Sequence, residues 1–454
     1  MRKKQKTMEE LLEEALVPEK EQPYEVPGNW VWTYTGSIAE VVGGGTPKTS
    51  VKEFYKGGTI PWITPADLSG YKKILISNGK RNITELGLAK SSAKMLPINS
   101  VLLSSRAPIG YVAIASHDLC TNQGFKSFLP SKAYYPQYLY WYLKSSKPYL
   151  ESMASGSTFK EISATRCKEI MVPLPPLNEQ IRIANKVERL LSKIDEAKRL
   201  IEEAKETFEL RRAAILDKAI RGEMMEKSHI SRESNANLYE IPINWKWKTF
   251  GDVAQVCSNL VDPKQYLELP HIAPDNIEKG TGQLLEYQTI EESKVKSPKH
   301  YFKKGQILYS KIRPYLSKVI IAEFEGLCSA DMYPIETDLD AKYLFWYMLS
   351  PFFVEKASTA GSRSVLPKIN KKELGNIPIP VPPKETQKKI VRIIESALSR
   401  EKQTIGYLES IVGLMEKLKQ SILSKAFRGE LGTNDPTEES AIELLKEVLQ
   451  EQVK

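Results

Sequence analysis

Apolar residues in the segment 178–223 recur at alternating steps of four and three, which predicts one long helix with a single apolar seam. One charged residue, Arg211, interrupts that seam. Two prolines, Pro175 and Pro176, precede the segment, and Arg221-Gly222 closes it, as suits the start and the end of a helix. At about 1.5 Å per residue, a helix of about 44 residues would span roughly 65 Å.

The same pattern returns in residues 385–430, and a constant step of 207 positions relates Gln180 to Gln387 and Gly222 to Gly429. The second seam also carries one charged residue, Glu401. If the two helices pair in antiparallel orientation, Arg211 can meet Glu401 near the middle of the pair. We therefore predict an antiparallel coiled coil whose register is set by Arg211 and Glu401.

The segments that precede the two long helices are related as well. Short β-branched runs in both predict strands, and two aromatic segments predict helices that pack into a core. The matching stretches are 27–32 with 242–247, 60–65 with 269–274, and 138–142 with 343–347. The predicted fold class is α+β: two mixed, strand-rich domains separated by two long helices in an antiparallel coiled coil, with an internal pseudo-two-fold repeat.

The two ends of the chain complete this repeat, because residues 9–16 resemble residues 442–449 and both predict a peripheral helix. A polar stretch without periodicity follows the first long helix and predicts a linker. The predicted segments are an N-terminal helix at 1–23, a first globular domain at 24–174, a long helix at 175–222, a linker at 223–240, a second globular domain at 241–381, a long helix at 382–429 and a C-terminal tail helix at 430–454.

The charge balance adds a hint about partners. The 454 residues carry a formal net charge of +9, which favours a polyanionic partner, although charges of both signs at 27% of the residues also suit an ordinary surface. No apolar run approaches membrane length, and the first residues lack a signal-peptide pattern. We expect a cytoplasmic protein with no membrane partner.

Patterns that indicate catalysis or metal binding are weak. The four cysteines show no CxxC spacing and the four histidines stand alone, which argues against a metal centre. Glycines 43–45 lead into Thr46-Pro47-Lys48 rather than a helix, which predicts a loop and not a phosphate cradle. A short nuclease-like pattern, Asp275 with Glu292 and Lys294, has no counterpart in the first half. We predict a non-catalytic binding protein that holds no cofactor and no metal.

Candidate DNA contacts are polar residues in the globular domains. Arg106 and Arg313 follow strand-like runs on proline-containing turns, where a guanidinium can hold a phosphate or a guanine edge with two hydrogen bonds. A lysine-rich stretch at 294–304 could cover several phosphates. Each feature also has a structural alternative: an arginine that ties a turn to the core, a solvated lysine face, or a hinge. The predicted DNA-binding residues are Lys48, Ser105, Arg106, Asn122, Gln123, Ser157, Lys160, Lys296, Lys299, Lys303, Lys311, Arg313, Arg363 and Ser364.

Repeated motifs bracket both long helices. VPLPPLNEQ at 172–180 leads into the first and RGE at 221–223 ends it, while IPVPP at 379–383 and RGE at 428–430 bracket the second. In these motifs the chain resembles the specificity (S) subunits of type I restriction-modification systems, and the resemblance covers essentially the whole chain. One departure is Glu385-Thr386-Gln387, where the family usually has an uninterrupted Glu-Gln.

The resemblance implies that each globular domain is a target-recognition domain that reads one half of an interrupted double-stranded DNA sequence. It implies that the long helices act as a spacer and dock two methyltransferase (M) subunits. S-adenosylmethionine would then be held by those subunits, and ATP with Mg²⁺ by the restriction (R) subunits of the full complex. Two alternatives stay open: a non-catalytic scaffold and a stand-alone DNA-binding regulator. Salt-dependent DNA binding would separate a reader of DNA from a scaffold.

Overall fold

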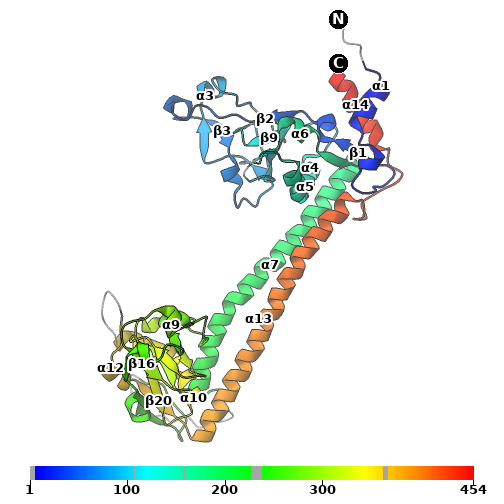
Figure 1. The fold of residues 1–454 in the computed structure, drawn as a ribbon. Helices are drawn as coiled ribbons and strands as arrows, with labels where there is room; N and C mark the ends of the chain where they lie inside the picture. Colours follow the sequence, from blue (N-terminus) through cyan, green and yellow to red (C-terminus); the bar gives the residue numbers. More distant parts are fainter. Residues whose placement is uncertain (1–5, 107, 157–159, 226–237, 361–366, 454) are drawn as a thin grey trace. The chain divides into compact units, whose positions relative to one another are not determined.

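A computed structural model describes residues 6–106, 108–156, 160–225, 238–360 and 367–453 (Figure 1). The chain divides into two compact units: unit 1 comprises Met1–Arg199 and Ile411–Lys454, and unit 2 comprises Leu200–Ser410. Two helices of 44 residues each, α7 (Leu177–Ile220) and α13 (Lys384–Phe427), run through both units. The two predicted long helices are therefore confirmed.

Unit 1 is a mixed domain of short strands and helices. Its elements are α1 (Met8–Ala15), η1 (Glu19–Glu21), β1 (Val31–Tyr34), α2 (Thr35–Ile38), β2 (Val41–Gly43), η2 (Lys52–Phe54), β3 (Ile60–Ile63), η3 (Pro65–Leu68), β4 (Leu75–Ile76), β5 (Arg81–Ile83), α3 (Glu85–Ala89), β6 (Val101–Ser104), β7 (Val112–Ala115), β8 (Cys120–Thr121), β9 (Phe125–Phe128), α4 (Pro136–Ser145), α5 (Lys147–Met153), α6 (Ala164–Lys168), β10 (Met171–Leu174) and α14 (Ala441–Val453).

Unit 2 is built in the same way. Its elements are β11 (Lys246–Thr249), α8 (Phe250–Val253), β12 (Ala254–Val256), β13 (Leu260–Val261), η4 (Pro263–Gln265), β14 (Pro270–Ile272), η5 (Pro274–Asn276), β15 (Gln288–Thr289), α9 (Ile290–Ser293), β16 (Lys299–Phe302), β17 (Ile307–Ser310), η6 (Pro314–Leu316), β18 (Val319–Ile321), β19 (Gly326–Cys328), β20 (Met332–Thr337), α10 (Ala341–Met348), α11 (Pro351–Ala360), α12 (Lys371–Gly375) and β21 (Pro378–Val381).

The sheets of the two units repeat the same topology. The strand order β2-β9-β6-β7 in unit 1 corresponds to β12-β20-β17-β18 in unit 2, and β5-β3-β8 corresponds to β15-β14-β19. In both units the first and last strands of the domain pair in antiparallel fashion, β1 with β10 and β11 with β21. Unit 1 adds β4, and unit 2 adds β13 and β16. The predicted α+β class with an internal repeat is confirmed.

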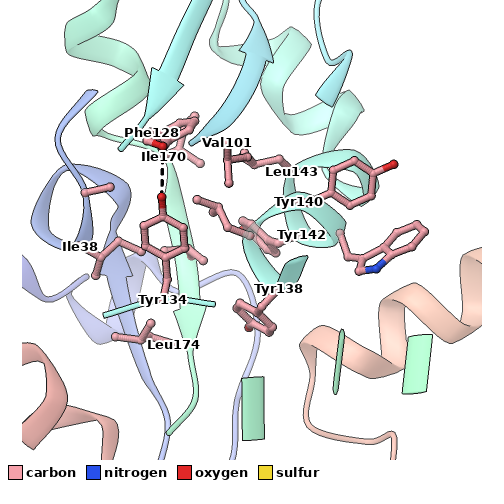
Figure 2. Packing of buried hydrophobic residues seen from close by; sticks show 14 of the residues in the cluster. Ile38, Val101, Phe128, Tyr134, Tyr138, Tyr140, Tyr142, Leu143, Ile170 and Leu174 are labelled. Carbon is pink, nitrogen blue, oxygen red and sulfur yellow. Dashed lines mark hydrogen bonds between the residues drawn. The ribbon is translucent and has the colours of Figure 1, made fainter. Parts of the chain in front are cut away.

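An aromatic helix packs against the strands in each unit. In unit 1, α4 contributes Tyr138 and Tyr142, whose hydroxyls donate to the carbonyls of Pro173 and Met171 on β10 at 2.6 and 2.5 Å. Figure 2 shows this core, including the bond from the Tyr134 hydroxyl to the Phe128 carbonyl. Because each buried hydroxyl finds a backbone acceptor, these tyrosines add apolar area without leaving an unpaired polar group.

The long helices pair within each unit in opposite directions. In unit 1 the first turns of α7 share a core with the last turns of α13, for example Ile183 with Ile422. In unit 2 the last turns of α7 share a core with the first turns of α13, for example Leu216 with Ile390. The pairing is therefore antiparallel, as the seam pattern predicts.

The glycine that follows each long helix has a specific steric role. Gly222 and Gly429 have φ of +79° and +74°, the left-handed region in which a side chain is strained. A Cβ at Gly429 would lie 2.3 Å from Cγ of Pro27, and one at Gly222 would lie 2.9 Å from Cγ of Pro242. Each Arg-Gly-Glu motif is thus matched to the proline that opens a globular domain.

The two terminal helices belong to unit 1, where α1 packs beside α14 (Figure 1). Thr7 caps α1 through a capping box with Glu10. Ala15 of α1 and Leu445 of α14 are buried in the unit 1 core. Over the residues that the structure describes, no helix is both long and apolar enough to cross a membrane.

Candidate nucleic-acid interface

In unit 1, two loops that are far apart in the chain are held together at the end of β6. The amide of Ile162 donates to the carbonyl of Ser105 at 2.9 Å, and Arg106 forms an isolated antiparallel bridge with Glu161. Arg106 is half-buried, while Lys160 is exposed. This pairing places two of the predicted DNA-binding cations, Arg106 and Lys160, in adjoining loops.

A third loop joins them through the segment between β8 and β9. The backbone amide and the hydroxyl of Ser105 both donate to the carbonyl of Gly124, at 2.8 and 3.2 Å. Asn122 accepts a bond from the Gly124 amide at 2.9 Å, so its side chain stabilises the turn. Gln123 is exposed and accepts a hydrogen bond from Thr46. Ser105 is fully buried, and it positions Arg106 rather than presenting its own hydroxyl.

The glycines before Lys48 lie close to the same turn. The amides of Gly44 and Gly45 donate to the carbonyls of Phe125 and Thr121 at 3.2 and 2.9 Å. A Cβ at Gly44 would lie 2.0 Å from the Asn122 carbonyl oxygen, so only glycine fits. Exposed Lys48 follows these glycines. Lys48, Arg106, Asn122, Gln123 and Lys160 therefore belong to one group of adjoining loops, which we name the first loop cluster.

A partly buried ion pair lies beneath the first loop cluster. The Lys126 side chain is only 11% exposed, and its Nζ lies 3.1 Å from Oε1 of Glu161 and 3.4 Å from Oγ of Ser105. The attraction holds Glu161 against Lys126 on β9. Removal of the Glu161 carboxylate would leave a buried ammonium group with one long hydrogen bond.

Unit 2 repeats the loop pairing, with a lysine at the position of Glu161. The amide of Ile369 donates to the carbonyl of Lys311 at 2.9 Å, and Ile312 forms an isolated bridge with Lys368. Lys368 occupies the place of Glu161 and pairs with Asp331 at 3.1 Å. The Lys368 and Asp331 side chains are both about two-fifths exposed. The strand register places Asp331 at the position of Gly124 in unit 1, so Asp331 is not the counterpart of Lys126.

Positive charge gathers around this loop pair in unit 2. The Lys311 Nζ lies 5.1 Å from the centre of the Tyr333 ring. Burial lowers the pKa of Lys311, and the neighbouring charge of Lys368 lowers it further. Burial likewise lowers the pKa of His300, with a further contribution from Lys311 and Lys371. The group Lys311, Arg313, Lys368 and Lys371 is named the second loop cluster.

Arg313 has an unusual backbone conformation for its residue type. Its φ is +47°, in the left-handed region, and its amide donates to the Pro367 carbonyl at 2.7 Å. The side chain is exposed. A strained position that is held by a backbone hydrogen bond and presents a guanidinium to solvent is consistent with a binding role.

The remaining predicted cations of unit 2 are not in the second loop cluster. Lys299 is buried, and its Nζ donates to the carbonyl and the hydroxyl of Ser297 at 3.0 and 2.6 Å, which indicates a structural role. Lys303 is exposed in a different groove, which acidic Asp252 and Glu336 also line. Lys296 is exposed in the loop before β16. Ser157, Arg363 and Ser364 lie outside the described residues.

The predicted register pair lies within unit 2. Arg211 is exposed, with its guanidinium 5.7 Å from the centre of the Phe208 ring. Burial raises the pKa of Glu401, whereas the charges of Arg212 and then Arg211 lower it. Among the described side chains, no salt bridge joins Glu401 to either arginine. The charge of Arg212 thus acts on Glu401 more strongly than that of Arg211, and the Arg211–Glu401 pair stays a prediction.

Sequence reasoning missed Lys126, Glu161, Lys368 and Lys371. A separation of 35 positions between Lys126 and Glu161 carries no local signal, because only strand pairing brings them together. The structure describes no group of three or more His, Cys, Asp or Glu side chains placed to hold a metal ion, and the four cysteines are free.

Residues 27–206 and 242–407 each match the family described as the type I restriction modification DNA specificity domain. The chain belongs to this family. The two matched segments correspond to the internal repeat, and both extend into a long helix.

Relatives and solved structures agree with this membership. The specificity subunit of the type I restriction enzyme EcoDI of Escherichia coli is 40% identical over 310 residues, which cover 65% of this chain and 70% of that protein. The MjaIX specificity subunit of Methanocaldococcus jannaschii is 31% identical and covers 89% of this chain and 94% of its own length. The HsdS subunit of Thermoanaerobacter tengcongensis has the same fold, with a TM-score of 0.61, 20% identity and coverage of 91% of this chain and 100% of that one. Family membership makes the chain a DNA-specificity protein and not an enzyme.

Proposed function

We propose that the chain is the DNA-reading subunit of a type I restriction-modification complex and recognises an interrupted double-stranded target. Each globular domain, residues 24–174 and 241–381, would read one half of that target. One observation carries the proposal: the two units build the same loop pairing at the end of equivalent strands, β6 and β17, but place different polar side chains on it. Two domains that read different half-sequences need different polar side chains at equivalent positions, because the base edges that they contact differ.

Within each half, we propose that exposed cations contact phosphates and that amides and guanidiniums contact base edges. In the first loop cluster Gln123 and Arg106 are candidates for base contact, and Lys48 and Lys160 for phosphate contact. In the second loop cluster Arg313 is the candidate for base contact. Ser157, Lys296, Arg363 and Ser364 stay predictions.

We further propose that α7 and α13 set the separation of the two half-targets and dock two M subunits. An apolar stripe on α13 supports docking, because Ile411, Leu414 and Leu418 are 41%, 62% and 51% exposed in unit 1. S-adenosylmethionine would be bound by the M subunits, and ATP with Mg²⁺ by R subunits, all in the cytoplasm where the DNA is.

The DNA-reading proposal is tested by salt-dependent binding of the chain together with an M subunit. Lys311→Ala should reduce the slope of log affinity against log salt concentration by about 1, as expected for the loss of one phosphate contact. Arg313→Ala, at the candidate base contact, should instead weaken binding by about 1–3 kcal/mol and relax the sequence preference. Lys303→Ala is the matched control, because the acidic neighbours of Lys303 make it a poor phosphate ligand. Equal slopes for Lys311→Ala and Lys303→Ala, or no salt dependence at all, would favour a scaffold over a reader.

The spacer proposal is tested by inserting four residues, about one helical turn or 6 Å, into one long helix. Mapping of methylated adenines in a host that carries the complex should show a changed gap between unchanged half-sequences. Altered half-sequences with an unchanged gap would refute the spacer role.

A further inference from the structure

Positive charge is concentrated in one part of unit 1, the segment 44–100 between β2 and β6. It contains nine Lys or Arg residues and three Asp or Glu residues, so its formal charge is +6, against +9 for the whole chain. All nine cations are exposed, and none forms a salt bridge among the described side chains: Lys48, Lys52, Lys56, Lys72, Lys73, Lys80, Arg81, Lys90 and Lys94. We name this segment the basic lobe.

The internal repeat supplies a comparison for this charge. In unit 2 the counterpart is the segment 257–306 between β12 and β17, because those strands correspond to β2 and β6. It contains seven lysines and seven Asp or Glu residues, so its formal charge is zero. One of the seven, Lys299, is buried and bonded to Ser297. Because the two segments build corresponding sheets, the fold itself does not require the charge of the basic lobe.

The basic lobe adjoins the first loop cluster. The indole of Trp62 on β3 donates to the Gly45 carbonyl at 2.9 Å, and the Tyr55 hydroxyl donates to the Pro47 carbonyl at 2.6 Å. Lys48 follows directly and belongs to both the lobe and the cluster. Figure 1 shows β3 and α3 of the lobe away from α7, so the lobe extends from the loops and not along the long helix.

Backbone and ring contacts hold four of these cations close together. The Lys56 amide donates to the Lys52 carbonyl at 2.8 Å, and the Lys48 carbonyl accepts from the amide three residues later at 3.1 Å. The three lysines therefore follow one another at steps of four along successive turns. The Arg81 guanidinium lies 4.5 Å from the centre of the Tyr55 ring, which places a fourth cation beside these turns.

The corresponding tyrosine of unit 2 has different surroundings. Tyr266 follows η4 as Tyr55 follows η2. The Tyr266 ring lies 5.7 Å from the Tyr301 ring, and the Tyr301 hydroxyl donates to the Glu325 carboxylate at 2.6 Å. A carboxylate therefore accompanies the ring pair in unit 2, whereas a guanidinium covers the tyrosine in unit 1.

We propose that the basic lobe binds backbone phosphates of double-stranded DNA next to the first half-target, and that the second domain makes no equivalent contact. Exposed cations bind phosphates by releasing counterions from the DNA, and such contacts carry no sequence information. This inference rests on the proposed DNA-reading function. It assigns a larger share of the salt-dependent affinity to the first domain, while both domains read sequence.

The test uses the full-length chain with an M subunit and a duplex that contains the target mapped through methylated adenines. Lys52→Ala combined with Lys56→Ala should lower the slope of log affinity against log salt concentration by about 2, because each phosphate contact contributes about 0.9. The affinity advantage of the unaltered chain should therefore shrink about tenfold between about 50 and about 200 mM salt. The pattern of methylated adenines should stay the same, because phosphate contacts do not specify sequence.

The matched control is Lys264→Ala combined with Lys279→Ala in unit 2. Both lysines are exposed and lie in the counterpart of the basic lobe, where Asp262 and Glu278 are close to them in the chain. This variant should leave the slope unchanged. A loss of slope as large as that of the Lys52 and Lys56 variant would overturn the assignment to the first domain.

Methylphosphonate linkages, which are uncharged, locate the contact on the DNA. Placed next to the first half-target, they should weaken binding of the unaltered chain and have little further effect on the variant with Lys52→Ala and Lys56→Ala. Placed next to the second half-target, they should affect both proteins equally. The reverse pattern would overturn the proposal.

The remaining outcomes separate this inference from the function on which it rests. An unchanged slope for the variant with Lys52→Ala and Lys56→Ala, while Lys311→Ala lowers the slope, would overturn the inference alone. Absence of salt dependence in the unaltered chain would overturn both. Weaker binding of the M subunit with an unchanged slope would overturn the inference in favour of a protein partner. Thermal melting close to that of the unaltered chain shows that each variant folds.

Discussion

The ion pair beneath the first loop cluster gives a prediction of definite size. Replacing Glu161 with alanine leaves the Lys126 ammonium, 11% exposed, with one hydrogen bond of 3.4 Å to Ser105. Breaking one partner of a buried pair costs about 3–5 kcal/mol. Because Glu161 itself is 40% exposed, we expect the lower end, about 3 kcal/mol. The loss should release the described segment 160–162 from Ser105 and leave the rest of unit 1 folded.

The matched control is Lys368→Ala in unit 2. Lys368 and Asp331 are 39% and 44% exposed, so solvent screens their attraction and the loss should be below about 1 kcal/mol. Native-state hydrogen exchange measures both effects locally. The Ile162 amide should exchange on the order of 100-fold faster in Glu161→Ala, and the Ile369 amide less than about fivefold faster in Lys368→Ala.

Two results would refute this reasoning. Unchanged exchange at Ile162 would mean that the Glu161 carboxylate does not hold the loop. Equal acceleration in the two variants would mean that burial of Lys126 is not what distinguishes the pairs. Glu161→Gln keeps a hydrogen-bond acceptor but removes the charge. Its Ile162 amide should exchange at a rate between those of Glu161→Ala and the unaltered chain.

Three further predictions concern the long helices. Burial raises the pKa of Glu179 above its usual value, so its contribution to stability is present at low pH and is lost as pH rises above about 4.5. In chemical denaturation, the free energy of unfolding of Glu179→Gln should therefore fall less between pH 4.5 and 7 than that of the unaltered chain. Parallel plots of unfolding free energy against pH for the two proteins would contradict this. Gln180→Ala should lower the free energy of unfolding by about 2–4 kcal/mol. The loss should exceed that of Gln387→Ala, because the Gln180 side chain makes three hydrogen bonds and the Gln387 side chain makes two. Equal losses in the two variants would count against this reasoning. A double-mutant cycle on Arg212 and Glu401 should give a coupling of about 0.5–1 kcal/mol, larger than the corresponding cycle with Arg211, and strict additivity would exclude a register role.

Glu179 also accounts for the departure at the start of the second long helix. It accepts hydrogen bonds from Trp30 Nε1 at 2.7 Å and Asn434 Nδ2 at 2.9 Å, and so ties the C-terminal tail to unit 1. The equivalent position of the second helix is Thr386, which has no carboxylate. The sequence difference thus corresponds to a tail contact that only the first helix makes among the described residues.

Local patterns were sufficient for the fold. The long helices and the buried aromatic helices follow from periodicity and proline placement, which are local features. The repeat follows from comparing one stretch with another 207 positions later, which needs no knowledge of packing. The close approach of the glycines before Lys48 to Asn122 could not be anticipated, because it depends on how two loops pack.

The candidate site was less predictable, because it depends on pairing between distant segments. Arg106 and Lys160 lie in adjoining loops because the Ile162 amide donates to the Ser105 carbonyl. Residue type suggested Ser105 and Lys299 as DNA contacts, yet both are buried and bond to neighbouring protein groups. A polar residue beside a strand end is equally suited to both roles until its burial is known.

The opposite charges of Glu161 and Lys368, which occupy equivalent positions, constrain how such proteins can acquire new targets. Moving only the loop that carries Lys368 into the first half would set one ammonium against Lys126, and moving only the Glu161 loop into the second half would oppose two carboxylates at Asp331. Either hybrid loses its attraction and gains repulsion. Recombination that carries a strand and its loop together preserves both pairs, so inheritance of whole domains is favoured over the exchange of fragments.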